Sequence, residues 1–150
     1  KENAVDALKN FIYKVHPILT PNIPEAEILT GKKINNLTDM KNVGKEIINL
    51  GASYVILKGG HMETPFITDL YIDDSEIHSI KSKKIITNHT HGTGCTMSSA
   101  LSAFLAKSFN VKCSFENAHK YVNHAIKNSP KFGRGNGPIN HCYNINEFTI

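Results

Sequence analysis

The strongest candidate for chemistry in the sequence is a short segment with two glycines, THGTGCT at residues 90–96, which follows a strand-like region and precedes helical spacing. Glycines let backbone N–H groups approach an anion closely, and the first turn of a helix offers unpaired N–H groups and a positive dipole end. We therefore expect Gly92, Thr93 and Gly94 to hold a phosphate or its transition state. The alternative is an ordinary helix start with Thr93 as its cap.

Cys95 lies at the expected start of the same helix. The N-terminal field of a helix lowers the pKa of a thiol from its reference value of about 8.5, so a thiolate there could act as a base or nucleophile. The alternative is a small buried hydrophobic residue, which is the commoner state of a lone cysteine on the inner side of a helix.

A second candidate lies at the end of a continuous apolar run, in VILKGGH at residues 55–61. Ligands of open α/β sheets bind at the carboxyl ends of strands, and a lysine is a point charge suited to phosphate. Lys58 is therefore a candidate phosphate ligand, with Gly60 beside it. A turn with a solvated lysine is the alternative.

The third candidate is an amide and a carboxylate three residues apart, Asn22 and Glu25. Their oxygens could hold Mg²⁺ through retained waters. Helix capping explains the same spacing and is the competing interpretation.

A glycine-rich segment, GRGNGPINH at residues 133–141, follows a helix rather than a strand, so it fails the context test for a dinucleotide fingerprint. We expect a loop beside a ligand. The sequence also lacks GxxxxGK[ST] and HExxH, and we interpret His89 and His91 as loop residues rather than metal ligands.

Composition narrows the function classes. The chain has 150 residues, of which 40% are hydrophobic and 20% charged, with a formal net charge of +4. Apolar runs of about 20 residues, which a membrane span needs, are absent from the sequence. An N-terminal segment with two acids and no apolar core predicts a cytosolic rather than a secreted protein. Scattered lysines without interleaved aromatic residues argue against nucleic-acid binding.

The spacing of apolar residues and breakers predicts the elements that position these residues. In chain order they are a helix over 5–15, an apolar stretch at 18–19, a helix from Pro24 to Gly31, a helix from Thr38 to Gly51, a buried strand at 54–57, two strands at 66–71 and 76–86 joined by a tight turn, a helix from Thr93, and a last helix capped by Ser114. This order predicts an α/β fold in one domain, with a parallel sheet and an antiparallel edge hairpin.

Five segments, taken in order, resemble the hydroxymethylpyrimidine/phosphomethylpyrimidine kinases of the ribokinase-like superfamily. They are TPNIPEAEILTG at 20–31, VILKGGH at 55–61, TDLYID at 68–73, THGTGCTMSSALSAFLA at 90–106 and GRGNGPINH at 133–141. The HGTGC and GPxNH elements are the most specific. The resemblance implies a three-layer α/β sandwich, here the C-terminal half of the sheet with helices on both faces.

The resemblance also implies that ATP and Mg²⁺ are used, with phosphoryl transfer to hydroxymethylpyrimidine and then to its phosphate. By position, Gly92, Thr93 and Gly94 match the anion hole that stabilises the transferring phosphoryl group. Cys95 matches the catalytic base, a position that sugar-kinase relatives fill with aspartate.

The remaining motif positions are assigned to the nucleotide and its metal. Lys58 matches a phosphate-contacting lysine, and Gly60 and Thr90 belong to the same nucleotide-binding motifs. Asn22 with Glu25 matches the motif that positions Mg²⁺ and its waters.

Residues 1–17 do not resemble the Gly/Ser-rich start of the family, whose first βα units supply most of the pyrimidine pocket. We therefore expect the C-terminal, nucleotide-side portion, associating with itself or with the missing N-terminal half because a half sheet exposes an edge and apolar helix faces. One alternative is a truncated or split remnant that binds nucleotide or a partner without turnover. Another is a pyridoxal-kinase-like relative.

Overall fold

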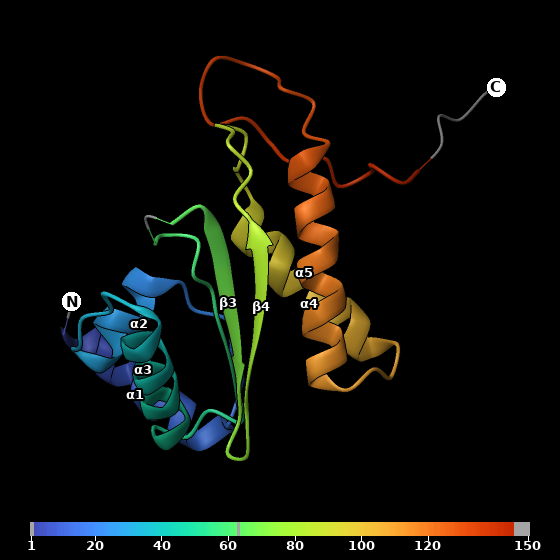
Figure 1. Cartoon of the computed structure of the whole chain (residues 1–150). Coiled ribbons are helices and arrows are strands. Elements are labelled where there is room, and N and C mark those ends of the chain that lie inside the picture. The colour runs from blue at the N-terminus through green and yellow to red at the C-terminus, as the bar shows by residue number, and fades with distance from the viewer. Residues whose placement is uncertain (1, 63, 146–150) are drawn as a thin grey trace. The chain divides into compact units, whose positions relative to one another are not determined.

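The protein is seen in a computed structural model that describes residues 2–62 and 64–145. The chain divides into two compact units, one up to Lys84 and one from Ile85 onward. Each unit is described by itself, and the ribbon in Figure 1 follows the chain through both.

The first unit contains three helices and a four-stranded sheet. In chain order its elements are α1 (Glu2–Val15), β1 (Ile18–Leu19), α2 (Ile23–Thr30), α3 (Leu37–Asn49), β2 (Tyr54–Leu57), β3 (Phe66–Ile72) and β4 (Ile77–Lys83). The strands lie in the order β1-β2-β3-β4, with β1 parallel to β2 and the other pairs antiparallel. The α/β class and the edge hairpin are confirmed, while the sheet is mixed rather than parallel. The last strand ends at Lys83, short of the predicted residue 86.

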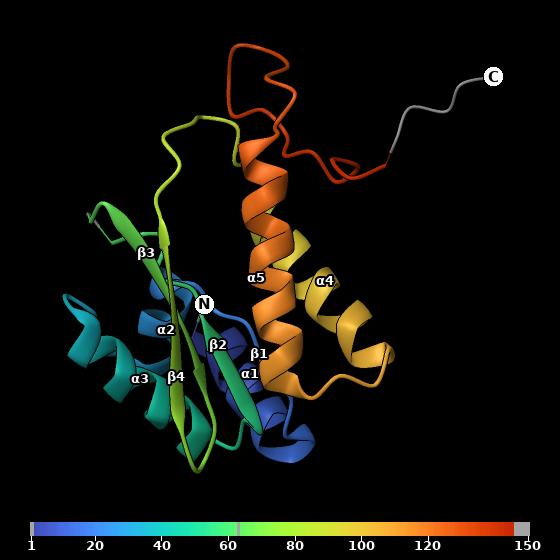
Figure 2. The same ribbon diagram turned by 45° about the vertical axis from the view of Figure 1, so that its right-hand side comes forward.

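One face of the sheet and the three helices form the core of this unit. Val55 and Leu57 of β2 pair with Ile72 and Leu70 of β3, and all four are fully buried. They pack against a buried apolar stripe on α3. The stripe comprises Met40, Val43 and Ile47, which recur at the spacing predicted from the sequence. Figure 1 shows α1, α2 and α3 on this side of the sheet, and Figure 2 shows α2 and α3 there again.

Asparagine caps decide where the helices of the first unit begin. Asn22 caps α2, and Gly31 ends that helix in the left-handed conformation, as predicted. The N-cap of α3 is Asn36 rather than Thr38, because the Asn36 side chain accepts the Asp39 N–H at 2.9 Å. Thr38 already lies inside the helix.

The second unit is a pair of helices followed by a long loop. Helix α4 (Thr93–Ala106) packs against α5 (Val111–Lys127), as Figure 2 shows. The predicted Ser114 cap of α5 is wrong. Asn110 is the N-cap and accepts the Cys113 N–H at 2.8 Å, while Ser114 is fully buried one turn further on.

The loop after α5 is tied back to this unit. Ile139 is buried, and the Asn140 N–H donates to the Ala125 carbonyl at 2.9 Å. Over the described part of the chain, every helix is too short or too polar to cross a membrane.

Candidate functional site

The start of α4 has a glycine where most helices have a capping side chain. Gly92 is the N-cap, with φ of 88°, and no side chain caps the helix. A Cβ at this position would meet no atom within 4 Å, so the backbone conformation rather than crowding requires glycine. Thr93 is therefore not the cap that one interpretation of the sequence predicted.

Only part of the first turn remains available to a ligand. The Thr93 N–H and its hydroxyl both donate to the Thr90 carbonyl, at 3.2 and 2.7 Å. A capping side chain normally accepts the next N–H groups, those of Gly94 and Cys95 here, and its absence leaves them to an anion. The structure thus places Gly92, Thr93, Gly94 and the exposed Thr90 in one helix start that can bind phosphate.

A residue from the C-terminal loop contacts this helix start. Thr96 Oγ1 donates a hydrogen bond to the Gly92 carbonyl oxygen at 2.8 Å. His141 Nε2 lies 2.8 Å from Thr96 Oγ1. The His91 N–H donates to the Gly137 carbonyl at 3.1 Å, which joins the two glycine-containing segments. Neither Thr96 nor His141 was predicted as a site residue from the sequence, although they lie in the THGTGCT and GRGNGPINH segments.

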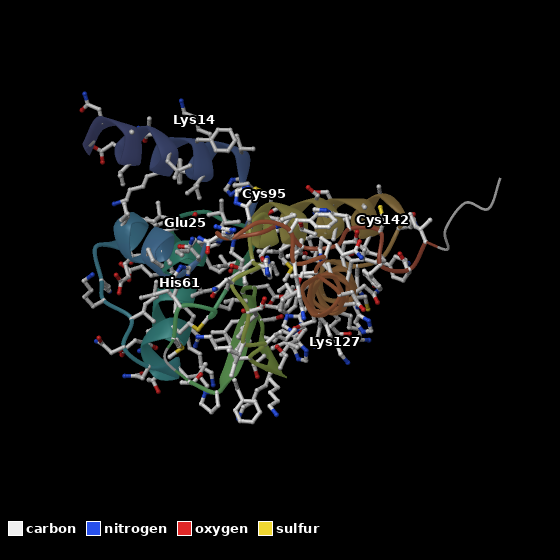
Figure 3. All side chains as sticks on the ribbon, turned by 90° about the horizontal axis from the view of Figure 1, so that it is seen from above. Lys14, Glu25, His61, Cys95, Lys127 and Cys142 are labelled. Carbon is white, nitrogen blue, oxygen red and sulfur yellow. The ribbon has the colours of Figure 1, made fainter. Side chains whose placement is uncertain are left out.

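Cys95 is exposed rather than buried in the core, which overturns the small-hydrophobe interpretation. It lies in the first turn of α4 and is labelled in Figure 3. It lines a cavity of about 430 Å³, whose other residues are Thr96, Ser99, Ala100, Ala103, Phe104, Lys107, Tyr121 and His141. The lining begins at Cys95 and continues along α4, so the cavity adjoins the start of the helix without including Gly92, Thr93 or Gly94.

In the first unit, Lys58 lies beside Asn22. The two residues form a parallel bridge, and the Lys58 N–H donates to the Pro21 carbonyl at 2.9 Å. Parallel strands end at the same edge of a sheet, so the ends of β1 and β2 place Asn22 and Lys58 next to each other.

Asn22 and Glu25 form a capping box at the start of α2. The Asn22 side chain accepts the Glu25 N–H at 2.9 Å, and Glu25 Oε2 accepts the Asn22 N–H at 2.7 Å. Helix capping therefore uses the single side-chain oxygen of Asn22 and one of the two carboxylate oxygens of Glu25.

The same two residues fit a hydrated Mg²⁺ but not a cage. Glu25 is exposed, and its other oxygen, Oε1, takes no part in the box. Within residues 2–62 and 64–145, no three His, Cys, Asp or Glu side chains gather closely enough to hold a metal by themselves. Mg²⁺ usually keeps several waters and uses one or two carboxylates together with the phosphates of a substrate. Glu25 can supply one such carboxylate.

Of the two glycines after β2, only the first is fixed by its protein neighbours. A Cβ on Gly59 would collide with the Thr68 carbonyl oxygen, and the Gly59 N–H donates to buried Asp69 Oδ1 at 2.8 Å. Gly60 is exposed and open, so it leaves room for a ligand near Lys58. Asp69 is a positioning residue that the sequence analysis missed. Its signal was an acidic residue inside an apolar strand.

The predicted site residues thus form two groups, each within one unit. Asn22, Glu25, Lys58 and Gly60 lie at the strand ends of the first unit. Thr90 and residues 92–95 lie at the start of α4 in the second.

Comparison with known proteins shows several similar kinases. A hydroxymethylpyrimidine/phosphomethylpyrimidine kinase of Bacillus subtilis is 42% identical over 142 residues, which are 94% of this chain and 52% of that protein. A pyridoxal kinase from Staphylococcus aureus in complex with AMP-PCP has a TM-score of 0.91 at 30% identity, covering 98% of this chain and 55% of the other. A phosphomethylpyrimidine kinase from Clostridium difficile 630 has a TM-score of 0.67 at 37% identity, covering 84% and 48%.

The chain spans about half the length of the curated relatives that it matches. The family model described as phosphomethylpyrimidine kinase matches residues 1–140, which include both groups of predicted site residues. On this match, the chain belongs to the phosphomethylpyrimidine kinase family.

Proposed function

We propose that this chain is the nucleotide-side part of a kinase that uses ATP to phosphorylate hydroxymethylpyrimidine and then its monophosphate, in thiamine biosynthesis. The observation that carries the proposal is the uncapped start of α4, where the Gly94 and Cys95 N–H groups are left to an anion. Family membership and relatives of the same name support the choice of substrate. The cytosolic location predicted from the sequence stays part of the proposal.

The helix start would act on the phosphoryl group in flight. Charge on its oxygens grows or spreads in the transition state, so prearranged N–H groups stabilise that state more than the ground state. Gly92 has no side chain that could cap the Gly94 and Cys95 N–H groups, so these stay available to the phosphoryl oxygens. The Thr93 hydroxyl is hydrogen-bonded to the Thr90 carbonyl.

The strand ends of the first unit are proposed to bind nucleotide phosphates. Lys58 supplies a positive charge for phosphate oxygens, and the open space at Gly60 lets them approach. Mg²⁺, when bound, neutralises charge on the phosphates, and Asn22 with Glu25 would hold its waters.

Cys95 is the proposed base that takes the proton from the substrate hydroxyl. Its exposure and its place on the cavity wall support this role. Replacing Cys95 with Ala in the complete kinase is expected to lower kcat by about 10²-fold or more, the usual contribution of general-base catalysis. Cys113→Ala is the matched control on α5. Unchanged turnover in Cys95→Ala would remove this residue from the mechanism.

The proposed function is tested by an acceptor panel. The complete kinase, meaning this chain together with the rest of the family domain, is assayed with ATP and with hydroxymethylpyrimidine, its monophosphate or pyridoxal. We expect transfer to the first two, and no transfer to either would overturn the proposal. This chain alone is expected to bind ATP without turnover, so turnover by it would contradict the proposed need for the other half.

A pyridoxal-type activity is the second candidate. The observation in its favour is that solved pyridoxal kinases of Staphylococcus aureus reach TM-scores of 0.90 and 0.91 against this chain. In the panel it is recognised by transfer to pyridoxal with a higher kcat/KM than to hydroxymethylpyrimidine. A remnant without turnover would bind ATP and phosphorylate none of the three acceptors.

A further inference from the structure

We propose that His141 is a positioning residue for the phosphoryl transfer. Acting through Thr96, it fixes the Gly92 carbonyl and thereby the first turn of α4, which carries the Gly94 and Cys95 N–H groups. This inference rests on the proposed function and assigns a role to a residue 45 positions away from its hydrogen-bond partner.

The Gly92 carbonyl is held by one residue at two points. The Thr96 N–H donates to it at 2.9 Å, and Thr96 Oγ1 donates to it at 2.8 Å. Glycine has wide conformational freedom, and Gly92 carries no side chain that could cap or anchor the turn. The orientation of the peptide group that follows Gly92 therefore depends on Thr96.

His141 in turn fixes the hydroxyl of Thr96. Its Nε2 lies 2.8 Å from Thr96 Oγ1, and Thr96 is only 6% exposed. A hydroxyl has one proton, which here goes to the Gly92 carbonyl, so His141 Nε2 has to donate. A neutral ring with its proton on Nε2 satisfies this arrangement, whereas the Nδ1–H tautomer does not.

His141 is itself anchored from α5. The Tyr121 hydroxyl donates to the His141 carbonyl at 2.7 Å, and the neighbouring Asn140 N–H donates to Ala125 at 2.9 Å. Burial, followed by the nearby Tyr143 and Cys142, raises the pKa of Tyr121, which keeps its hydroxyl protonated as a donor. A chain of hydrogen bonds thus connects α5 to the anion-binding turn.

The test replaces His141 in the complete kinase. His141→Phe keeps a ring but removes the donor, and we expect kcat to fall by about tenfold or more with little change in the KM for ATP. Loss of a whole oxyanion donor costs about 10²–10³-fold, and misaligned donors lose part of that. His141→Gln, whose amide can donate to Thr96, is expected to recover most of kcat. His124→Phe on the exposed side of α5 is the matched control.

A second pair of variants separates positioning from folding. Thr96→Val keeps the side-chain volume but removes the hydroxyl, and we expect the same loss of kcat as in His141→Phe. Because both residues act in one chain, the double variant should lose no more than either single variant. Multiplicative losses would overturn the proposal, as would losses in His141→Phe that His141→Gln does not recover.

A third readout is independent of turnover. Nitrogen-15 NMR of the imidazole is expected to show the Nε2–H form of His141 in the wild-type protein and to lose its hydrogen-bond shift in Thr96→Val. An Nδ1–H tautomer would overturn the proposal. If wild-type kinase transfers phosphate to none of the acceptors, the proposed function is wrong. If the wild-type kinase is active and His141→Phe has the same kcat, only the proposed role of His141 is wrong.

Discussion

At the start of α4, one residue decides whether N–H groups are open to a ligand. Gly92 has a left-handed backbone with no side-chain cap, and Thr96 and His141 hold that conformation from outside the turn. The proposed anion site would thus be made from main-chain groups, and Thr96 and His141 would hold the turn that presents them.

Gly92→Ala is expected to destabilise the protein by about 1–2 kcal/mol, the cost of placing an L-residue in the left-handed region. The added methyl group meets open space, so the whole loss comes from the backbone. Chemical denaturation measures it. Gly135→Ala is the matched control, since its Cβ is equally open and its φ is not positive. Equal stabilities of the two variants would contradict the strain at Gly92.

Lys58→Ala is expected to weaken ATP binding by about 10- to 100-fold, because hydrogen bonds to charged groups contribute about 1.5–3 kcal/mol. Isothermal titration of the complete kinase measures this affinity. Lys45→Ala, on the exposed surface of α3, removes the same charge away from the strand ends. An ATP affinity unaltered by Lys58→Ala would remove Lys58 from the nucleotide site.

Among the elements, α5 shows most clearly what a local pattern leaves open. The sequence contains Asn110 and Ser114 four residues apart, and both types cap helices. The turn after α4 ends at Asn110, so its side chain meets the Cys113 N–H, and Ser114 falls inside the helix. The helix itself was predictable from its apolar spacing, whereas the choice of cap depended on where the turn closed.

The two candidate caps of α5 give opposite expectations. Asn110→Ala is expected to lower the free energy of unfolding by about 1 kcal/mol through the loss of the cap. Ser114→Ala is expected to leave stability unchanged or to raise it, because its buried hydroxyl has no hydrogen-bond partner among the residues that the structure describes. Urea denaturation of both variants distinguishes them. A larger loss of stability in Ser114→Ala than in Asn110→Ala would indicate that Ser114 caps the helix.

Asp73 organises the turn of the β3–β4 hairpin. Burial acts to raise its pKa, but hydrogen bonds from the Tyr71 hydroxyl at 2.6 Å and from Glu76 and Ser75 outweigh it and lower the pKa from 3.8 to about 2. The folded state thus favours the ionised form, and its contribution to stability is complete above about pH 4 and is lost as the pH falls to about 2.

Asp73→Asn is therefore expected to be less stable than wild type at neutral pH, with a gap that closes between about pH 4 and pH 2. Urea midpoints measured across this range test it. Asp74→Asn, at the exposed neighbouring position, is the control and should follow the wild-type curve. A gap that stays constant down to pH 2 would show that Asp73 acts through packing rather than charge.

At the scale of the whole molecule, the candidate site residues could be predicted only where they are close together in the sequence. The helix start at residues 90–96 and the strand end at Lys58 each carry their signal in consecutive letters. The contact between Thr96 and His141 joins residues 45 positions apart. A local sequence pattern cannot predict which distant side chain contacts the start of α4. Asp69 was missed for the same reason, since its acceptor role depends on the pairing of β2 with β3.

Helix α1 has an apolar stripe that is only partly covered, which predicts association. Ile12 is fully buried, but its neighbours on the stripe, Leu8, Phe11 and Val15, are 45%, 51% and 54% exposed. Exposed apolar faces of this kind mark interaction surfaces. We expect the purified chain to self-associate in sedimentation velocity experiments. Phe11→Lys should shift it toward monomer, while Asn10→Lys adds the same charge elsewhere on α1 as a control. A chain that is monomeric at every concentration would contradict this expectation.

The two outer strands of the sheet differ in a way that limits how it can be enlarged. Strand β4 carries exposed Lys81 and Lys83, charges that oppose the addition of a further strand. At the other side, β1 consists of the half-buried apolar residues Ile18 and Leu19. The β4 edge of the sheet is therefore protected by charge, and the β1 edge is better suited to pairing with a further strand.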